Sequence, residues 1–241
     1  KAKGEKDEPI VIEEFPGLQG EVEWDPRPIS RKGSERVIKF AFDLARHRQR
    51  KMGVPQSVTC VDKSNVTRGC RLFRGIFKEI SDQNPDIETD AAYIDAFTMW
   101  LMRDPEDLDV VVLPNMFGDI ATDLASVLQG GLGMAASANL GPKHMMFEPV
   151  HGSAPKYTGK NVVNPIATLQ SVQMMFEALA YRKKDDDLDM CADILQQAIQ
   201  QHFEEGGGVT YDLGRDASTS EGGQAIADRC EEMLRERFAT A

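Results

Sequence analysis

The sequence predicts an α/β fold, and three of its features lead to that prediction. Short apolar segments of strand length alternate with longer segments whose apolar residues recur at helical spacing. One short segment, Leu108–Leu113 (LDVVVL), is typical of a strand buried in a parallel sheet. It leads through Pro114 and a short turn into a helix beginning near Gly118. Strands that alternate with helices in this way are characteristic of α/β proteins.

The elements expected before this strand follow from the spacing of apolar residues. Within Glu35–Arg50 the apolar side chains recur every three or four positions, which predicts a helix. Gly53-Val54-Pro55 ends that helix, and Val58–Val61 then predicts a short buried strand. Two more helices are expected at about 68–80 and 91–103.

After the helix near Gly118, the second half of the chain is predicted to be mainly helical. Glycines at 130, 131 and 133 are followed by an expected long loop region that reaches about Pro165. Helices are then expected at 166–181, at 189–203 and near 221–236.

Composition narrows the class of protein. The chain has 241 residues, 41% of them hydrophobic, which suits one large domain or two smaller ones. Its formal charge of −11 argues against nucleic acid or an anionic membrane surface as the main partner. No apolar stretch approaches the roughly 20 residues needed to span a bilayer, so we expect a soluble protein.

Cysteine usage and the N-terminal segment bear on the compartment. The four cysteines are widely spaced and form no CxxC or CxxH pattern, so we expect free thiols rather than disulfides or a zinc site. The segment KAKGEKDEP lacks the apolar core of a signal peptide. Cytoplasm and mitochondrial matrix both fit these features.

Two carboxylates mark the most informative segment. Asp119 and Asp123 lie four residues apart at the start of the expected helix, so their side chains project about 40° apart on one face. Such acids can act simply as partners of the helix dipole. Here, however, they directly follow a buried strand, where open α/β sheets place their ligands. Carboxylate oxygens suit Mg²⁺ or Mn²⁺, and Asp95, on a nearby helix, is a third candidate ligand.

Four segments together resemble the isocitrate and isopropylmalate dehydrogenase family, the metal-dependent β-decarboxylating dehydrogenases. NMFGDIATDLASVLQGGLGM resembles the signature of that family, and FEPVHGSAPKYTGKNVVNPIA resembles its nucleotide-binding loop. VTCVDKSNV resembles its lysine segment, and YIDAFTMWLMRDPEDLDVVV its third-aspartate segment. The similarity runs from about Ile10 to the C-terminus in the order of the family.

The resemblance implies a three-layer fold of two domains that share a mixed sheet and differ from a Rossmann fold. By the architecture of the family, a tail at 1–8 precedes a smaller, dimerising and catalytic domain at 9–130. Residues 131–241 would form the C-terminal part of the cofactor-binding domain. The chain lacks roughly the first third of a typical member, so we expect that the natural polypeptide is longer or that another chain fills the gap.

The resemblance also implies roles for the acids and for a lysine. Asp119 and Asp123 would bind the divalent metal, and Asp95 would complete the site from a second subunit. Lys63 would take part in proton transfer at the substrate hydroxyl and would also reach across from the neighbour. Active sites built from two chains imply an obligate homodimer. Without the neighbouring motifs, Lys63 would be interpreted as an exposed lysine after a strand.

The expected nucleotide is NADP. Five positions match the NADP-type pattern of the family: Lys156, Tyr157, Val163, Tyr211 and Arg215. A 2′-phosphate favours cations and hydroxyl donors, whereas an acid would repel it. By the same resemblance, further contacts to the nucleotide are expected, at the adenosine from His151, Gly152 and Asn164, and near the nicotinamide from Glu148.

The resulting prediction is an NADP- and metal-dependent dehydrogenase that oxidises and decarboxylates a 3-carboxylated 2-hydroxy acid, with isocitrate favoured. The alternatives are isopropylmalate, homoisocitrate, tartrate or malate, and a catalytically degenerate structural or regulatory subunit. Two departures from the family support the last alternative: the missing N-terminal third, and Gln19 at the position of a proton-donating tyrosine. A glutamine forms hydrogen bonds but is not a useful acid. Ile12 or a neighbour similarly stands where an arginine is usual.

Overall fold

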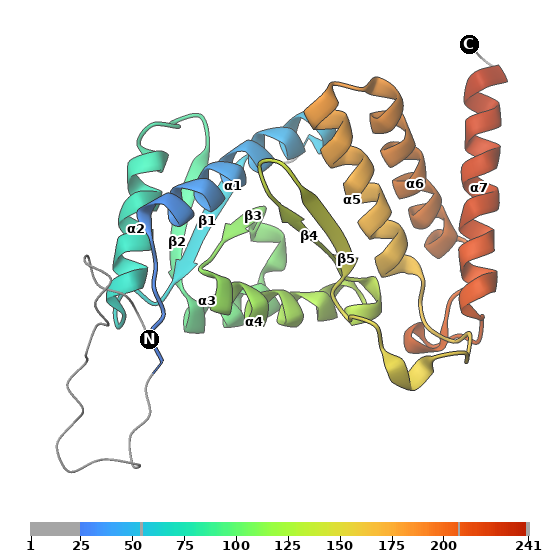
Figure 1. The fold of residues 1–241 in the computed structure, drawn as a ribbon, viewed down its shortest axis with the longest axis horizontal. Coiled ribbons are helices and arrows are strands. Elements are labelled where there is room, and N and C mark those ends of the chain that lie inside the picture. The colour runs from blue at the N-terminus through green and yellow to red at the C-terminus, as the bar shows by residue number, and fades with distance from the viewer. Residues whose placement is uncertain (1–24, 54, 207, 240–241) are drawn as a thin grey trace. The chain divides into compact units, whose positions relative to one another are not determined.

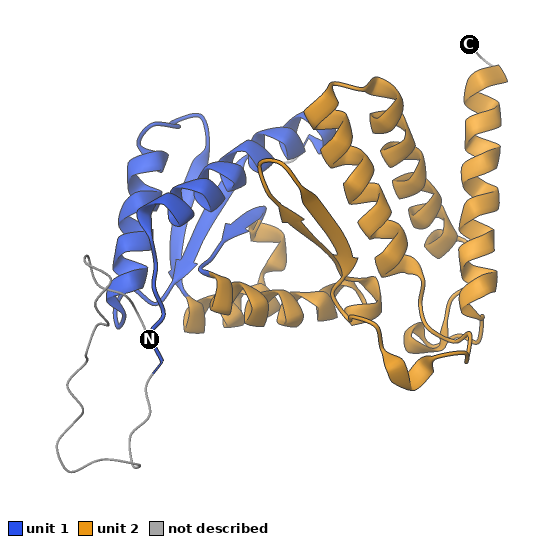
Figure 2. Ribbon diagram, viewed as in Figure 1, with its two compact units in different colours: residues 1–93, 109–114 blue, residues 94–108, 115–241 orange. Residues whose placement is uncertain are grey.

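The computed structural model describes residues 25–53, 55–206 and 208–239 (Figure 1). These residues form two compact units. The first contains the described residues up to Tyr93 together with Asp109–Pro114, and the second contains Ile94–Leu108 and the chain from Asn115 onward (Figure 2). The predicted tail and the departures from the family at Ile12 and Gln19 lie outside the described residues.

The first unit is built on a parallel sheet with the strand order β2-β1-β3. Its strands are β1 (Ser57–Asp62), β2 (Glu88–Tyr93) and β3 (Val110–Val112). In the central strand, Val58 lies opposite Val110 of β3 and is fully buried. The predicted α/β class with a buried parallel sheet is therefore confirmed.

Helices α1 (Arg31–Met52) and α2 (Arg68–Ser81) pack against each other and against this sheet. Helix α1 begins after Ser30, whose hydroxyl accepts a hydrogen bond from the Gly33 amide at 3.2 Å. The apolar positions of both helices fill one core with the sheet, and each large side chain buried there contributes about 1.5–3 kcal/mol. The largest contributors are Ile38, Phe42, Phe73, Ile76 and Phe77.

The second unit combines helices with one antiparallel hairpin. Its helices are α3 (Ile94–Arg103), α4 (Asn115–Ser126), α5 (Ile166–Lys183), α6 (Asp186–Glu204) and α7 (Thr219–Ala239). The hairpin strands are β4 (Ala136–Leu140) and β5 (Met145–Pro149). Short 3-10 helices are η1 (Pro105–Asp107), η2 (Val127–Gln129), η3 (Leu132–Met134), η4 (Pro155–Tyr157) and η5 (Tyr211–Leu213). Apolar side chains of α5, α6 and α7 form the core of this unit.

Strand β2 corrects one prediction. A helix was expected from Ala91, but Glu88–Tyr93 forms β2 and the helix begins only at Ile94. The strand pairs along its length with β1, where Ala92 lies opposite Val61. Its exposed and half-buried residues give no apolar signal of their own, so pairing with the neighbouring strand overrides the helix propensity of the two alanines.

Three further differences from the expectations are smaller. The loop region expected before Pro165 contains the hairpin β4–β5, whose half-exposed strands lack a clear alternation of apolar and polar residues. Helix α4 begins at Asn115, earlier than the expected start near Gly118. The spacing of apolar residues along α4 and η2 predicts a buried face that includes Ile120, Val127 and Leu128, but all three side chains are exposed in this chain. The domain boundary near residue 130 stays a prediction.

Candidate functional site

Lys63 lies in the turn that joins β1 to α2. Its backbone carbonyl accepts hydrogen bonds from the amides of Val66 and Thr67, at 3.0 and 2.9 Å. The lysine is half-buried. The end of a buried parallel strand and the start of the next helix thus fix the position of this residue, which the sequence predicted to be catalytic.

Asp119 and Asp123 lie on one face of α4, and both are exposed. The Asn115 side-chain amide donates to Oδ2 of Asp119 at 2.9 Å. The buried residues of this helix are Ala121 and Ser126. Two exposed carboxylates at this spacing offer several oxygen ligands, which fits the chemistry of a hard divalent cation.

Asp95 lies in the first turn of α3 and is also exposed. Among the residues that the structure describes, no three acidic, histidine or cysteine side chains come together in a way that could hold a metal ion. Within one chain, therefore, Asp95 does not complete a cluster with Asp119 and Asp123. Its contribution from a second subunit stays a prediction.

The two tyrosines expected at the nucleotide come together in the second unit. Tyr157 ends η4 and Tyr211 begins η5, and their ring centroids are 6.3 Å apart with planes inclined by 34°. The pKa of the Tyr211 phenol is raised, first by its hydrogen bond with the Tyr157 side chain. Lys160 places its ammonium 5.6 Å from the centre of the Tyr157 ring. Both hydroxyls therefore form one exposed polar site beside a cation.

The cations expected at the 2′-phosphate, Lys156 and Arg215, are both exposed. Lys156 precedes Tyr157 within η4. Arg215 follows η5 through Gly214, whose positive φ of 82° turns the chain, and its amide donates to the Thr210 carbonyl at 3.3 Å.

Asn164 connects these segments. It is buried, its Nδ2 donates to Asp212 Oδ2 at 3.1 Å, and its Oδ1 accepts from the Ile166 amide at 2.9 Å. Asp212 in turn accepts from the Thr210 hydroxyl at 2.5 Å. The start of α5 is thereby tied to the segment that carries Tyr211, so the side chain of Asn164 has a structural role in this chain. Nearby, the Val163 carbonyl accepts from the Thr219 hydroxyl at 2.6 Å.

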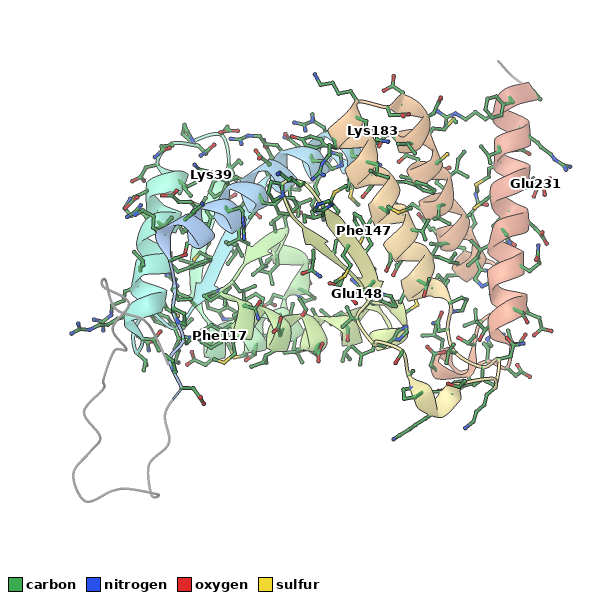
Figure 3. All side chains as sticks on the ribbon, viewed as in Figure 1. Lys39, Phe117, Phe147, Glu148, Lys183 and Glu231 are labelled. Carbon is green, nitrogen blue, oxygen red and sulfur yellow. The ribbon has the colours of Figure 1, made fainter. Side chains whose placement is uncertain are left out.

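The remaining expected nucleotide residues lie at and after β5. Glu148 lies on β5 (Figure 3), and its side chain is exposed. A ring nitrogen of His151 forms a 2.7 Å hydrogen bond with the Gly152 carbonyl, and Gly152 has a φ of 67°. A glycine is suited to this position because other residues rarely adopt such a backbone conformation.

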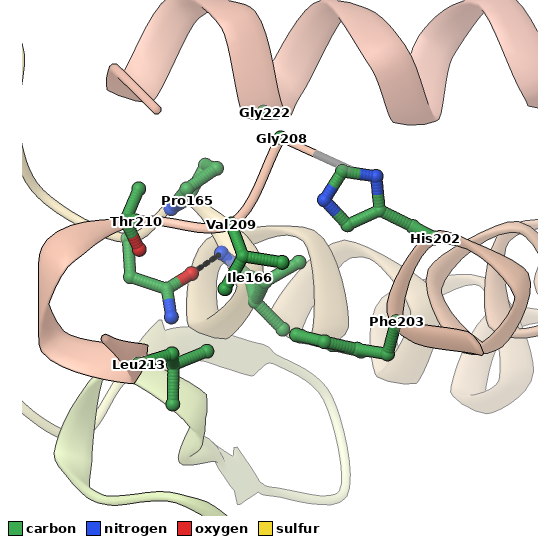
Figure 4. Close-up of a pocket in the computed structure, with 10 residues that line it drawn as sticks. Pro165, Ile166, His202, Phe203, Gly208, Val209, Thr210, Leu213 and Gly222 are labelled. Atoms are coloured by element: carbon green, nitrogen blue, oxygen red, sulfur yellow. Dashed lines mark hydrogen bonds between the residues drawn. The ribbon is translucent and has the colours of Figure 1, made fainter. Parts of the chain in front are cut away.

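A small cavity lies near this region, between the start of α5, the end of α6 and Gly208–Thr210 (Figure 4). His202 lines it and is 3% exposed, and burial lowers the pKa of its imidazole. The cavity has room for about one water molecule. It is therefore a feature of packing and not a nucleotide pocket.

The order of these segments is that of a known family. Residues 5–226 match the family described as isocitrate/isopropylmalate dehydrogenase. The chain belongs to this family. Its members are metal-dependent oxidative decarboxylating dehydrogenases that use NAD or NADP.

Individual relatives cover most of this chain. A 3-isopropylmalate/3-methylmalate dehydrogenase of Methanocaldococcus jannaschii is 40% identical over 225 residues, which are 90% of this chain and 64% of that protein. An NADP isocitrate dehydrogenase of Thermus thermophilus is 42% identical over 202 residues, 82% of this chain and 38% of that protein. The chain thus spans less than two thirds of either relative.

A solved structure of the same family supports the fold. The crystal structure of isocitrate dehydrogenase from Methylococcus capsulatus superimposes with a TM-score of 0.75 at 39% sequence identity. The match covers 84% of this chain and 57% of that one. The fold expected from the resemblance is therefore confirmed. Among the described residues, no helix has the length and apolar character needed to cross a bilayer.

Sequence reasoning missed two groups of side chains that support this site. Asp212 gave no signal beyond its place beside Tyr211, because its hydrogen bonds to Asn164 and Thr210 depend on the fold. Asp62 and Arg74 were also missed, although Asp62 directly precedes Lys63. A buried acid at the end of an apolar strand is the signal that could have pointed to this pair.

Proposed function

We propose that this family member is an NADP- and Mg²⁺- or Mn²⁺-dependent dehydrogenase that oxidises and decarboxylates a 3-carboxylated 2-hydroxy acid, with isocitrate as the favoured substrate. The observation that carries the proposal is the pair of exposed carboxylates, Asp119 and Asp123, on one face of α4. Oxygen ligands of this kind hold Mg²⁺ and Mn²⁺ in proteins.

In this proposal each group of residues has one task. When bound, the cation supplies Lewis-acid stabilisation of charge on the substrate, and NADP supplies the hydride acceptor. Asp119 and Asp123 would hold the cation, which would bind the substrate through its hydroxyl and adjacent carboxylate. Lys63 exchanges the proton of that hydroxyl. Asp95, from the second subunit, completes the ligand set.

The choice of NADP depends on the Tyr157–Tyr211 site. Its two phenol hydroxyls and the exposed cations Lys156 and Arg215 are suited to a 2′-phosphate, which accepts hydrogen bonds and carries negative charge. No acid of the kind that binds a ribose hydroxyl occupies position 156. The other nucleotide contacts would come from Glu148, His151, Gly152, Val163 and Asn164.

The proposed homodimer is supported by the surfaces of α3 and α4, which pack against each other within the second unit. Both helices leave large apolar side chains exposed, namely Met99, Met102, Met116 and Ile120. An apolar surface of this kind is typical of a subunit interface. A dimer that uses it would bring the partner to the helices that carry Asp95 and Asp119.

A second candidate substrate is 3-isopropylmalate. It is favoured by the 40% identity, over 90% of this chain, to an enzyme named for isopropylmalate and methylmalate. Homoisocitrate, tartrate and malate share the same 2-hydroxy acid group. The substituent on C3 distinguishes all these acids, and one panel therefore separates them.

The experiment is NADP reduction, followed by absorbance with the complete protein, Mn²⁺ and this panel of acids. Turnover with isocitrate and NADP, faster than with any other acid or with NAD, is the expected result. Faster turnover with isopropylmalate would move the assignment to the second candidate. If no acid is oxidised and calorimetry detects no NADP binding, the chain serves instead as a structural or regulatory subunit.

A further inference from the structure

A buried ion pair lies directly beside the turn of Lys63. The Arg74 guanidinium donates to both oxygens of Asp62, at 2.8 and 3.1 Å. Asp62 is fully buried at the end of β1, and the Arg74 side chain is 26% exposed on α2. Figure 1 shows α2 running alongside β1 and β2. A bidentate pair of this kind fixes the orientation of both side chains as well as their separation.

Arg74 also reaches the neighbouring strand. A second hydrogen bond runs from the same guanidinium to the Ala92 carbonyl at 2.7 Å, and the Tyr93 ring centre is 5.7 Å from the guanidinium carbon. Burial by itself lowers the pKa of Arg74, but the hydrogen bond to Asp62 and the charge of that residue raise it overall. One cation therefore joins the ends of β1 and β2.

Asp62 extends this network into the turn. Its Oδ1 accepts a hydrogen bond from the Ser64 amide at 2.8 Å. Arg71, from the same helix as Arg74, donates to the Ser64 carbonyl at 2.8 Å. Side-chain hydrogen bonds thus fix the residues on both sides of Lys63. The Lys63 carbonyl itself accepts hydrogen bonds from the backbone amides of Val66 and Thr67.

From this geometry we propose that Arg74 is a positioning residue for Lys63. It fixes the carboxylate of Asp62, which fixes the Ser64 amide and so the turn between them. The consequence for catalysis rests on the proposed function, but the consequence for the turn does not. A pair that only stabilised the unit would not need its acid to bond the backbone of the Lys63 turn.

The first test uses the complete protein and measures amide hydrogen exchange, resolved to single residues by mass spectrometry. In Arg74→Ala we expect the amides of Ser64, Val66 and Thr67 to exchange at least about tenfold faster. Arg46→Ala is the matched control, because Arg46 also donates to two partners, Asn84 and Asp86, within the same unit. It should leave exchange in the turn unchanged.

The second test measures kinetics with Mn²⁺, NADP and the acid that the wild-type protein oxidises. In Arg74→Ala kcat should fall roughly 10- to 100-fold, because a small displacement of a catalytic group is costly, while KM for NADP should stay within about twofold. Added guanidinium ion should restore part of kcat in Arg74→Ala but not in Lys63→Ala. The kcat of Arg74→Lys should lie between those of wild type and Arg74→Ala. If Arg74→Ala does not fold, Arg74→Lys takes its place in the test.

The two tests separate the two proposals. If the amides of the turn exchange as slowly in Arg74→Ala as in wild type, Arg74 is not a positioning residue, whatever the kinetics show. Faster exchange with unchanged kcat would overturn its catalytic consequence. A wild-type protein that oxidises no acid would refute the proposed function, and the exchange result would still decide what Arg74 does to the turn.

Discussion

The phenol rings of Tyr157 and Tyr211 lie with their centroids 6.3 Å apart, although they belong to separate 3-10 turns of the second unit. The hydrogen bond with the Tyr157 side chain is the main reason that the pKa of Tyr211 is raised, so the Tyr211 phenol stays protonated and able to donate at neutral pH. This relationship supports a phosphate site with hydroxyl donors, and it yields the first prediction.

The double substitution Lys156→Asp and Arg215→Ala should weaken NADP binding by roughly 10- to 100-fold, because it removes two cations and adds a repelling acid. Binding of NAD, which lacks the 2′-phosphate, should change by less than about twofold on the same reasoning. Isothermal calorimetry with both nucleotides measures the difference. Lys183→Ala, an exposed lysine at the end of α5, is the control. Equal losses for NADP and NAD would refute the roles given to these residues.

Asp123→Asn should weaken binding of Mn²⁺ by at least about 100-fold, since a neutral amide replaces a charged oxygen ligand. Titration followed by the electron paramagnetic resonance of free Mn²⁺ measures the change. Asp187→Asn, which alters an exposed acid in the first turn of α6, should leave the affinity as it is in wild type. An Asp123→Asn protein that binds Mn²⁺ normally would show that α4 holds no metal.

Gly133→Ala should lower the free energy of unfolding by about 1–2 kcal/mol through overpacking. A Cβ atom at Gly133 would lie 2.7 Å from Asp212 Oδ2, which hydrogen bonds to Asn164 keep in place. Gly75→Ala is the matched control, because a Cβ there meets nothing within 4 Å, and in the middle of α2 it should stabilise by about 0.5–1 kcal/mol. Urea unfolding distinguishes the two, and equal stability of both variants would contradict the packing described for Asp212.

The pH dependence of stability should report the buried His202. Burial lowers the pKa of its imidazole below the usual value of 6.5, so the unfolded chain binds the proton more readily than the folded one. The neutral imidazole of His202 therefore contributes to the free energy of unfolding above pH 6.5. This contribution is lost as the pH falls toward the pKa of His202 in the folded state. Urea unfolding between pH 7 and 5 should therefore show a steeper loss for wild type than for His202→Gln. His144→Gln, at an exposed histidine, should keep the wild-type slope.

The sequence predicts best those elements whose residue pattern lies within one short segment of the chain. The strand at β1 and the helix α2 were predicted closely, because a run of apolar residues and a helical period lie within a few residues of one another. The placement of Asp119 and Asp123 on one face of a helix was predicted for the same reason. Strand β2 was missed because its residues carry no apolar pattern and its pairing partner, β1, is distant in sequence.

Side-chain networks formed by the fold were not predictable. Arg74 meets Asp62 and Ala92 only because α2 packs along the sheet, and no spacing rule relates those positions. The burial expected for Ile120 was wrong for this chain, in which the side chain is 57% exposed. The helical period places Ile120 on an apolar face of α4, but a period alone cannot tell whether the fold of one chain covers that face.

The central claim is that each metal site uses Asp119 and Asp123 of one chain and Asp95 of another, and mixed dimers test it most directly. Asp95→Asn and Asp119→Asn proteins should each be inactive alone. After both are unfolded together and refolded, half of the dimers should contain one intact site, which restores about a quarter of wild-type activity. If the mixture stays as inactive as its components, while wild type recovers from the same treatment, the active site is not shared between chains.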